Sequence, residues 1–478
     1  MILLQVCRTL RQMYLSSSEL QYIVEISGQQ LLIIPNTDKS IPISKRLQLL
    51  RDKVHAWFKV DTHPFEMVPV LTWAPSSRDN IVAGGHFCLW NPPRDTAMIF
   101  SVLPKPSQQS IQRNWLPGTL CSVPYSRNLD VFMDPAQNLI AVAYVVDHKT
   151  VYINLGALDG DHSHPEAAGE RLLSDDSENR FEATMAKLKG FGRHIALSRR
   201  WDDENRASFF KWQLQIWDWK YSTTSDSILS GAVLNRIVGP VDFCFLGNNR
   251  LLVITDNLNL YSIENMSQMP ELLACFLMPI PLMAPQCLPL IDDIGYGSQL
   301  HMQAQATMCT SDPTHRLICL TALSVRNSTQ VFIISTRIFF DLNEMAAATP
   351  IPWQHWGPSN TCVFLYPFDF KIHINGNRVL HTLPVAVTNR RGLGRVVKEP
   401  STTCIGADLS GRFGESLTTS LPYVQVVFWE RKFGADSLLR DMWIDKDRVY
   451  MLSRSSSIDR LEVIDVQSDL QSGVVSTG

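Results

Sequence analysis

Four side chains that could ligate a metal ion lie close together in the sequence: Asp159, Asp161, His162 and His164. Carboxylate and imidazole groups are ligands that zinc accepts, usually in a tetrahedral set. The segment that contains them, residues 158–189, is polar and acidic, which is typical of a solvated surface insertion. We therefore interpret these side chains as exposed loop residues, and we expect neither a metal site nor a cofactor.

The sequence lacks the motifs of common catalytic sites. It contains no Gly-x-Ser-x-Gly nucleophile elbow, no His-Glu-x-x-His metalloprotease helix and no P-loop. The RGLGR segment, with Gly392 and Gly394, resembles part of a phosphate loop but has no strand before it. No set of acid, base and metal groups converges, so the sequence predicts a protein that is not an enzyme. An enzyme is the minor alternative.

Four further side chains are candidates for a partner-binding surface. Trp353 and Trp356 lie between prolines in IPWQHWGP, and Arg390 and Arg391 belong to a stretch rich in Gly and Arg, residues 389–413. Trp and Arg often dominate protein interfaces. For the tryptophans we favour packing between sheets over a partner surface, and for the arginines we favour a solvated loop.

Composition limits the possible partners and compartments. The chain has 478 residues, 45% of them hydrophobic, and a formal net charge of -3. Such a charge argues against nucleic acid or an anionic membrane as a partner, and no apolar run is long enough to span a bilayer. Ten cysteines occur singly, without any Cys-x-x-Cys pair. We expect reduced thiols and a cytoplasmic or nuclear protein.

Residues 1–60 show helical periodicity. Apolar residues recur at three- and four-residue steps in the first fourteen positions, and SSSEL supplies a helix-capping signal. A third helix is expected after Pro42, with Leu47, Leu50, Val54 and Trp57 on its apolar face. Short helices of this kind need a partner on which to pack.

Residues 61–478 show the short apolar runs and frequent turn signals of β-strands. One unit recurs: a turn rich in Asp, Pro, Gly and Asn, then Asn, Arg or His, then an aliphatic residue that opens a strand. Seven such starts, about 55 to 70 residues apart, predict a seven-bladed β-propeller in which neighbouring sheets cover each other's faces. An irregular pair of β-sandwiches is the alternative. The opening aliphatic residues are Ile81, Leu139, Ile195, Leu251, Leu317, Val379 and Val449.

The opening QVCRTLRQMYLSSSELQYIVEI resembles the second half of an F-box, in which a Cys-Arg-x-Leu-Arg helix precedes a Ser-x-x-Leu helix. With SKRLQLLRDKVHAW, LQIWDWK (a WD-like strand), IPWQHWGP, VVKEP and TSLPYVQV, the whole chain resembles F-box proteins abundant in mushroom-forming fungi. The family's first helix, which carries a Leu-Pro dipeptide, would lie upstream of Met1. We therefore expect either a truncated gene model or weakened adaptor binding.

The resemblance implies a substrate-recognition subunit of a cullin–RING ubiquitin ligase. Its partners would be a Skp-type adaptor, a cullin scaffold and an unknown client protein held by the β-rich domain. The alternative is a propeller scaffold without a ligase role. The residues that match the family's adaptor-binding or F-box packing positions are Leu3, Val6, Cys7, Leu10 and Leu20.

Overall fold

A computed structural model gives the fold. It describes residues 7–33, 41–59, 66–69, 81–104, 110–121, 123, 126–146, 150–174, 185–202, 209–234, 241–288, 309–323, 328–342, 350–367, 371–382, 404–405, 418–419, 437–455 and 458–466. Every structural statement below concerns these residues.

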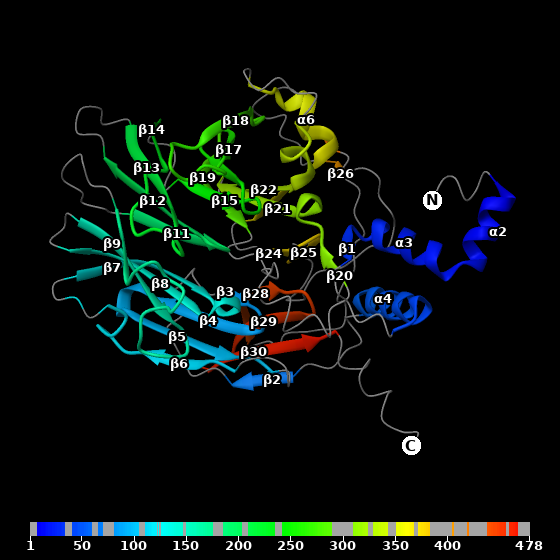
Figure 1. The fold of residues 1–478 in the computed structure, drawn as a ribbon, viewed down its shortest axis with the longest axis horizontal. Coiled ribbons are helices and arrows are strands. Elements are labelled where there is room, and N and C mark those ends of the chain that lie inside the picture. Colours follow the sequence, from blue (N-terminus) through cyan, green and yellow to red (C-terminus); the bar gives the residue numbers. More distant parts are fainter. Residues whose placement is uncertain are drawn as a thin grey trace.

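The body of the molecule is a β-propeller of six four-stranded antiparallel sheets, here called blades 1 to 6 (Figure 1). Blade 1 contains β3 (Ile81–Ala83), β4 (His86–Asn91), β5 (Thr96–Ser101) and β6 (Gln112–Trp115). Blade 2 contains β7 (Ser126–Asp134), β8 (Leu139–Val146), β9 (Thr150–Ala157) and β10 (Arg171–Leu173). Blade 3 contains β11 (Met185–Phe191), β12 (His194–Asp202), β13 (Phe209–Asp218) and β14 (Ile228–Leu234).

Blades 4 and 5 follow the same order along the chain, whereas blade 6 takes its fourth strand from an earlier part of the chain. Blade 4 contains β15 (Asp242–Phe245), β16 (Arg250–Ile254), β17 (Leu258–Ser262) and β18 (Glu271–Phe276). Blade 5 contains β19 (Met283–Leu288), β21 (Leu317–Leu323), β22 (Ser328–Ser335) and β23 (Thr361–Pro367). Blade 6 contains β28 (Ser437–Ile444), β29 (Arg448–Ser455), β30 (Ile458–Asp465) and β2 (Glu66–Pro69).

Each blade places its first strand nearest its neighbours' first strands, so β7, β11, β15 and β19 contact one another in succession and β28 contacts β3. Because successive strands are antiparallel, the connections after the first and third strands share one face of the propeller, which we call the hairpin face. Separate apolar clusters fill the spaces between adjacent blades. This is the arrangement predicted from the repeat, in which each sheet covers the face of the next.

The ring is closed by strands from distant parts of the chain. β2 pairs with β30, with Val68 opposite Leu461, so an early strand completes the last blade. Arg448 in blade 6 adds a second link, because its guanidinium donates to the carbonyl oxygens of Val102 and Leu103 in blade 1 at 2.6 Å.

The prediction of seven blades is not matched. The six predicted starts outside Val379 lie in strands of the six blades, whereas Val379 lies in a two-stranded hairpin of β24 (Ile372–Asn375) and β25 (Arg378–His381). This hairpin contacts β21 of blade 5 and β28 of blade 6. Two short strands, β26 (Cys404–Ile405) and β27 (Thr418–Thr419), form a separate pair.

The predicted turns have a clear physical basis. The carboxylate of Asp134 accepts from the amide of Ala136 at 2.9 Å, and Asn138 then takes the left-handed conformation that Asn tolerates. In blade 6 the carboxylate of Asp445 accepts from the amides of Asp447 and Arg448. These side chains satisfy turn amides that no ladder reaches, which is why polar residues recur before each strand.

Four α-helices are described. They are α2 (Arg8–Ser16), α3 (Ser18–Gly28), α4 (Ile43–Phe58) and α6 (Trp353–Asn360). The first three lie together at one side of the propeller, as Figure 1 shows, whereas α6 belongs to the connection between the last two strands of blade 5. No helix in the described part of the chain is long and apolar enough to cross a membrane.

The cysteines depart from expectation at one position. Eight cysteines carry free thiols, but Cys362 in β23 is disulfide-bonded. The prediction that all ten thiols are reduced is therefore wrong at Cys362.

Candidate interaction sites

The N-terminal helices form a small unit with its own core. We call residues 7–33 and 41–59 the helical unit; besides α2, α3 and α4 it contains β1 (Leu31–Ile33). Tyr22 and Ile26 of α3 pack against Leu47 and Leu50 of α4, and all four are buried. Helix α3 begins within the predicted SSSEL segment, but the capping residue is Ser17, whose hydroxyl accepts from the amide of Leu20 at 3.2 Å, and not Ser16 or Ser18 as expected.

Helix α3 also carries a second apolar face that points away from this core. Leu20, Ile23 and Val24 are spaced three and four residues apart, so they share one side of the helix, opposite Tyr22 and Ile26. Helix α2 has no buried residue. Six large apolar side chains of the two helices are between 38% and 60% exposed: Leu10, Met13, Leu15, Leu20, Ile23 and Val24.

We call these six residues the apolar helical face. Exposed large apolar side chains gathered on two neighbouring helices mark an interaction site on a folded protein more often than scattered single residues do.

The helical unit is attached to the propeller by strand pairing. Strand β1 pairs antiparallel with β20 (Cys309–Ser311), which lies in the connection between β19 and β21 of blade 5. The ladder is extended by the amide of Asp312, which donates to the carbonyl of Gln30 at 3.0 Å. The hydroxyl of Tyr22 lies 3.6 Å from the sulfur of Cys309. Backbone pairing fixes the register of this attachment.

Helix α4 makes a second attachment, to blade 6 and the β24–β25 hairpin. Lys53 forms an ion pair with Asp447 at 2.8 Å. Ala56 and Trp57 pack against the apolar cluster of blade 6, and the guanidinium of Arg378 lies 4.4 Å from the Trp57 ring centroid. The helical unit is therefore held on the hairpin face at two separate places.

The residues that match F-box positions divide into three groups. Leu3 and Val6 lie outside the described residues. Cys7 is half-buried at the start of α2. Leu10 and Leu20 are 45% and 41% exposed and belong to the apolar helical face. The sequence did not single out Ile23 and Val24, although their spacing from Leu20 is a helical signal.

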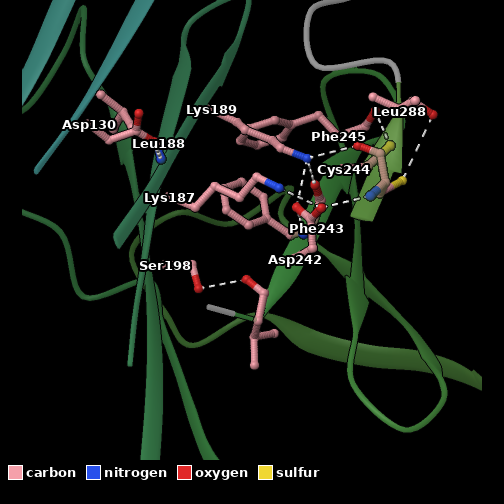
Figure 2. Close-up of polar contacts among 12 residues, drawn as sticks. Asp130, Lys187, Leu188, Lys189, Ser198, Asp242, Phe243, Cys244, Phe245 and Leu288 are labelled. Carbon is pink, nitrogen blue, oxygen red and sulfur yellow. Dashed lines mark hydrogen bonds and ion pairs between the residues drawn. The ribbon is translucent and has the colours of Figure 1, made fainter. Parts of the chain in front are cut away.

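A buried charged cluster near the inner strands joins three blades (Figure 2). Asp242 of β15 lies between Lys187 and Lys189 of β11, with both nitrogen–oxygen distances at 2.7 Å. The same carboxylate accepts from the amide of Cys287 in β19 at 2.7 Å, and Lys189 donates to the carbonyl of Phe243 at 2.7 Å. Five groups from blades 3, 4 and 5 thus satisfy one another.

Electrostatics keep this cluster ionised. Burial raises the pKa of the Asp242 carboxyl, but Lys187 and Lys189 outweigh burial and bring it down to about 2. Burial lowers the pKa of Lys189, and the carboxylate beside it more than compensates, so this pKa is raised. A carboxylate and an ammonium held in these states are poor proton donors and acceptors near pH 7. The cluster is suited to joining blades rather than to acid–base chemistry.

Two other first strands carry an aspartate at the same position. Asp130 of β7 accepts from the amide of Leu188 in the next blade at 2.6 Å, and Asp441 of β28 accepts from the amide of Met442 at 2.9 Å. Burial raises the pKa of Asp441 to about 6, because only Lys371 and one amide oppose it. Equivalent positions therefore have opposite electrostatic environments.

One group resembles a catalytic relay but has the wrong geometry. His315 Nδ1 lies 3.0 Å from Asp312 and 2.9 Å from the Thr314 hydroxyl. A relay needs different ring nitrogens for the carboxylate and the nucleophile, and here one nitrogen faces both. This group instead forms the polar turn before β21.

The predicted metal-type residues do not converge. Within the described residues, no group of three or more His, Cys, Asp or Glu side chains could hold a metal ion. Asp161 pairs with Arg113, whereas His164 is buried edge-to-face against Trp219 at 4.8 Å. Residues 158–174 are therefore not simply a solvated insertion, because they include β10 and a buried histidine that packs on blade 3.

The predicted partner surface is corrected at its tryptophans. Trp353 and Trp356 begin α6 and are buried, with Trp356 fully inaccessible and its indole donating to the carbonyl of Leu277 at 3.1 Å. Their rings pack on Phe332 and Phe276. The packing alternative is thus the one observed. Arg390 and Arg391 lie outside the described residues.

Comparisons with known proteins add little. No family model matches the sequence, and no curated protein matches it. One similar solved structure is an uncharacterized protein from Listeria monocytogenes EGD-e, with 10% identity and a TM-score of 0.32 over 84% of this chain and 92% of that chain. That TM-score carries no argument about function. The β-propeller assignment rests on the sheet topology described above.

Proposed function

We propose that the chain is a client-binding subunit of a cullin–RING ubiquitin ligase, in which the apolar helical face binds a Skp-type adaptor and the propeller holds a client protein. The observation that carries this proposal is the apolar helical face itself. Six exposed apolar side chains on α2 and α3 are costly in water, and a partner protein that covers them would recover that free energy.

The two attachments of the helical unit support the same function. A ligase subunit must hold its client at a defined distance from the adaptor. Here β1 pairs with β20 and Lys53 pairs with Asp447, so the helices cannot pivot freely about a single linker. A six-bladed propeller supplies a rigid body with two broad faces for a client. We further propose that the chain acts in the cytoplasm or nucleus and catalyses no reaction itself.

The direct test is binding of the purified chain to a recombinant Skp-type adaptor, measured by isothermal titration calorimetry. We expect saturable binding, weakened roughly five- to thirtyfold by Leu10→Gln and by Leu20→Gln, because each removes about 1–2 kcal/mol of buried apolar contact. Met269→Gln is the matched control, since Met269 is an exposed apolar side chain on blade 4. Absence of binding by the folded chain would refute the adaptor assignment.

The competing proposal is a propeller scaffold that has no ligase role. It shares the propeller but makes no use of the apolar helical face. Affinity purification from a fungal lysate separates the two proposals, because the ligase subunit should recover cullin together with the adaptor, and Leu20→Gln should lose both while retaining the client.

A further inference from the structure

The helical unit carries a charge opposite to that of the whole chain. Its residues 7–33 and 41–59 contain seven Lys and Arg against three Asp and Glu, a net charge of +4, whereas the complete chain has a net charge of -3. The basic side chains are therefore concentrated on the part of the molecule that carries the apolar helical face.

Three arginines lie on or beside the helices that carry the apolar helical face. Arg8 and Arg11 are exposed on α2, on either side of Leu10 in sequence. Arg51 of α4 donates to the side-chain oxygen of Gln21 at 3.1 Å, which places its guanidinium beside α3. Within the described residues, none of the three arginines makes an ion pair with the protein's own carboxylates. Their charges are available to a partner.

We propose that the apolar helical face binds a protein whose apolar groove is bordered by Asp and Glu side chains, and that Arg8, Arg11 and Arg51 pair with those carboxylates. This inference rests on the proposed function and specifies the chemistry of its partner. Charged residues at the rim of an interface accelerate association and make it sensitive to salt.

An anionic membrane is the less favoured occupant. Helices that bind at membrane surfaces combine a basic face with Trp, Phe and Leu anchors, whereas the six side chains of the apolar helical face are Leu, Met, Ile and Val. The exposed Phe58 lies at the end of α4, outside this face. The helices are also fixed to the propeller by β1 and α4, which limits how deeply they can enter a bilayer.

The test uses the full chain and a recombinant Skp-type adaptor, with association followed by surface plasmon resonance at about 50 and 500 mM NaCl. The triple variant Arg8→Glu, Arg11→Glu, Arg51→Glu should lower the association rate roughly tenfold or more at low salt, and high salt should lower the wild-type rate. Arg127→Glu is the control, because it reverses the charge of an exposed side chain on β7. Unchanged thermal unfolding of each variant confirms that it remains folded.

The outcomes separate the two proposals. Adaptor binding that Leu20→Gln weakens but that neither salt nor the triple variant changes would overturn the acidic-rim inference and leave the proposed function standing. No adaptor binding by the wild type would overturn both. Binding of the wild type to phosphatidylserine vesicles, lost in the triple variant, together with salt-insensitive adaptor binding, would assign the arginines to a membrane and overturn the inference.

Discussion

Replacing Asp242 with Asn should strongly destabilise the propeller. The carboxylate is 1% exposed and lies 2.7 Å from both Lys187 and Lys189. Its pKa of about 2, against an ordinary 3.8, corresponds to about 2 kcal/mol of stability at neutral pH. This contribution is present above pH 4 and is lost as the pH falls through 2. The substitution also leaves the Lys189 ammonium buried without its counter-charge, which typically costs about 3–5 kcal/mol.

The same substitution at Asp441 should have the opposite effect on the free energy of unfolding. Asp441 occupies the corresponding strand of blade 6, but its pKa is raised to about 6. A raised carboxyl pKa means that ionisation costs stability, and this cost grows as the pH rises from about 4 through 6. Asp441→Asn should therefore stabilise the protein by about 1–3 kcal/mol at pH 8 and should have little effect at pH 4. Its amide oxygen can still accept from the amide of Met442.

Urea unfolding followed by tryptophan fluorescence measures both effects, since blade 3 contains three buried tryptophans. Adding Lys187→Met and Lys189→Met to Asp242→Asn should recover most of the loss, because apolar side chains need no counter-charge. If Asp242→Asn costs less than about 1 kcal/mol, or if Asp441→Asn is equally destabilising, then charge pairing does not control this junction.

Three further changes test other parts of the fold. Arg448→Met should cost about 3–5 kcal/mol in urea unfolding, since it leaves blade 1 carbonyls and a blade 6 carboxylate without their donor; a near-neutral result would mean that this link does not help close the ring. Burial, with a smaller effect of a neighbouring arginine, lowers the pKa of His194 to about 4. The free energy of unfolding should therefore fall by about 3 kcal/mol as the pH drops from 6.5 to 4. His194→Phe should make the free energy of unfolding less dependent on pH over this range. Gly190→Ala should lower the melting temperature, because its Cβ would lie 2.5 Å from the Phe132 ring; Gly28→Ala, with open space around it, should not.

The strand starts were predictable because their signal is local. A polar turn residue satisfies free amides and the next aliphatic residue enters the sheet, so Leu139, Leu251 and Val449 could be identified without a structure. The prediction of a seventh blade was wrong because it relied on the same local signal. Val379 follows the same turn signal, but a start signal does not state how many strands follow it, and only β24 and β25 form there in the described residues.

The inner-strand aspartates could not be interpreted in advance. Asp130, Asp242 and Asp441 each precede a short apolar run, a weak repeated signal in hindsight. Their roles depend on which side chains the neighbouring blades bring close, and that is a property of the ring. The tryptophans of IPWQHWGP were ambiguous because flanking prolines suit both an exposed loop and the start of a helix.

The pairing of β2 with β30 has a consequence for biosynthesis. Residues 66–69 leave the ribosome early, yet their partner strand is complete only when Asp465 has been made. Throughout that interval blade 1 lacks its neighbour in the ring, and the apolar cluster it shares with blade 6 stays open to solvent. Helix α4 likewise lacks its packing partner until blade 6 has been made. The nascent chain therefore exposes apolar surface that can aggregate until translation nears its end.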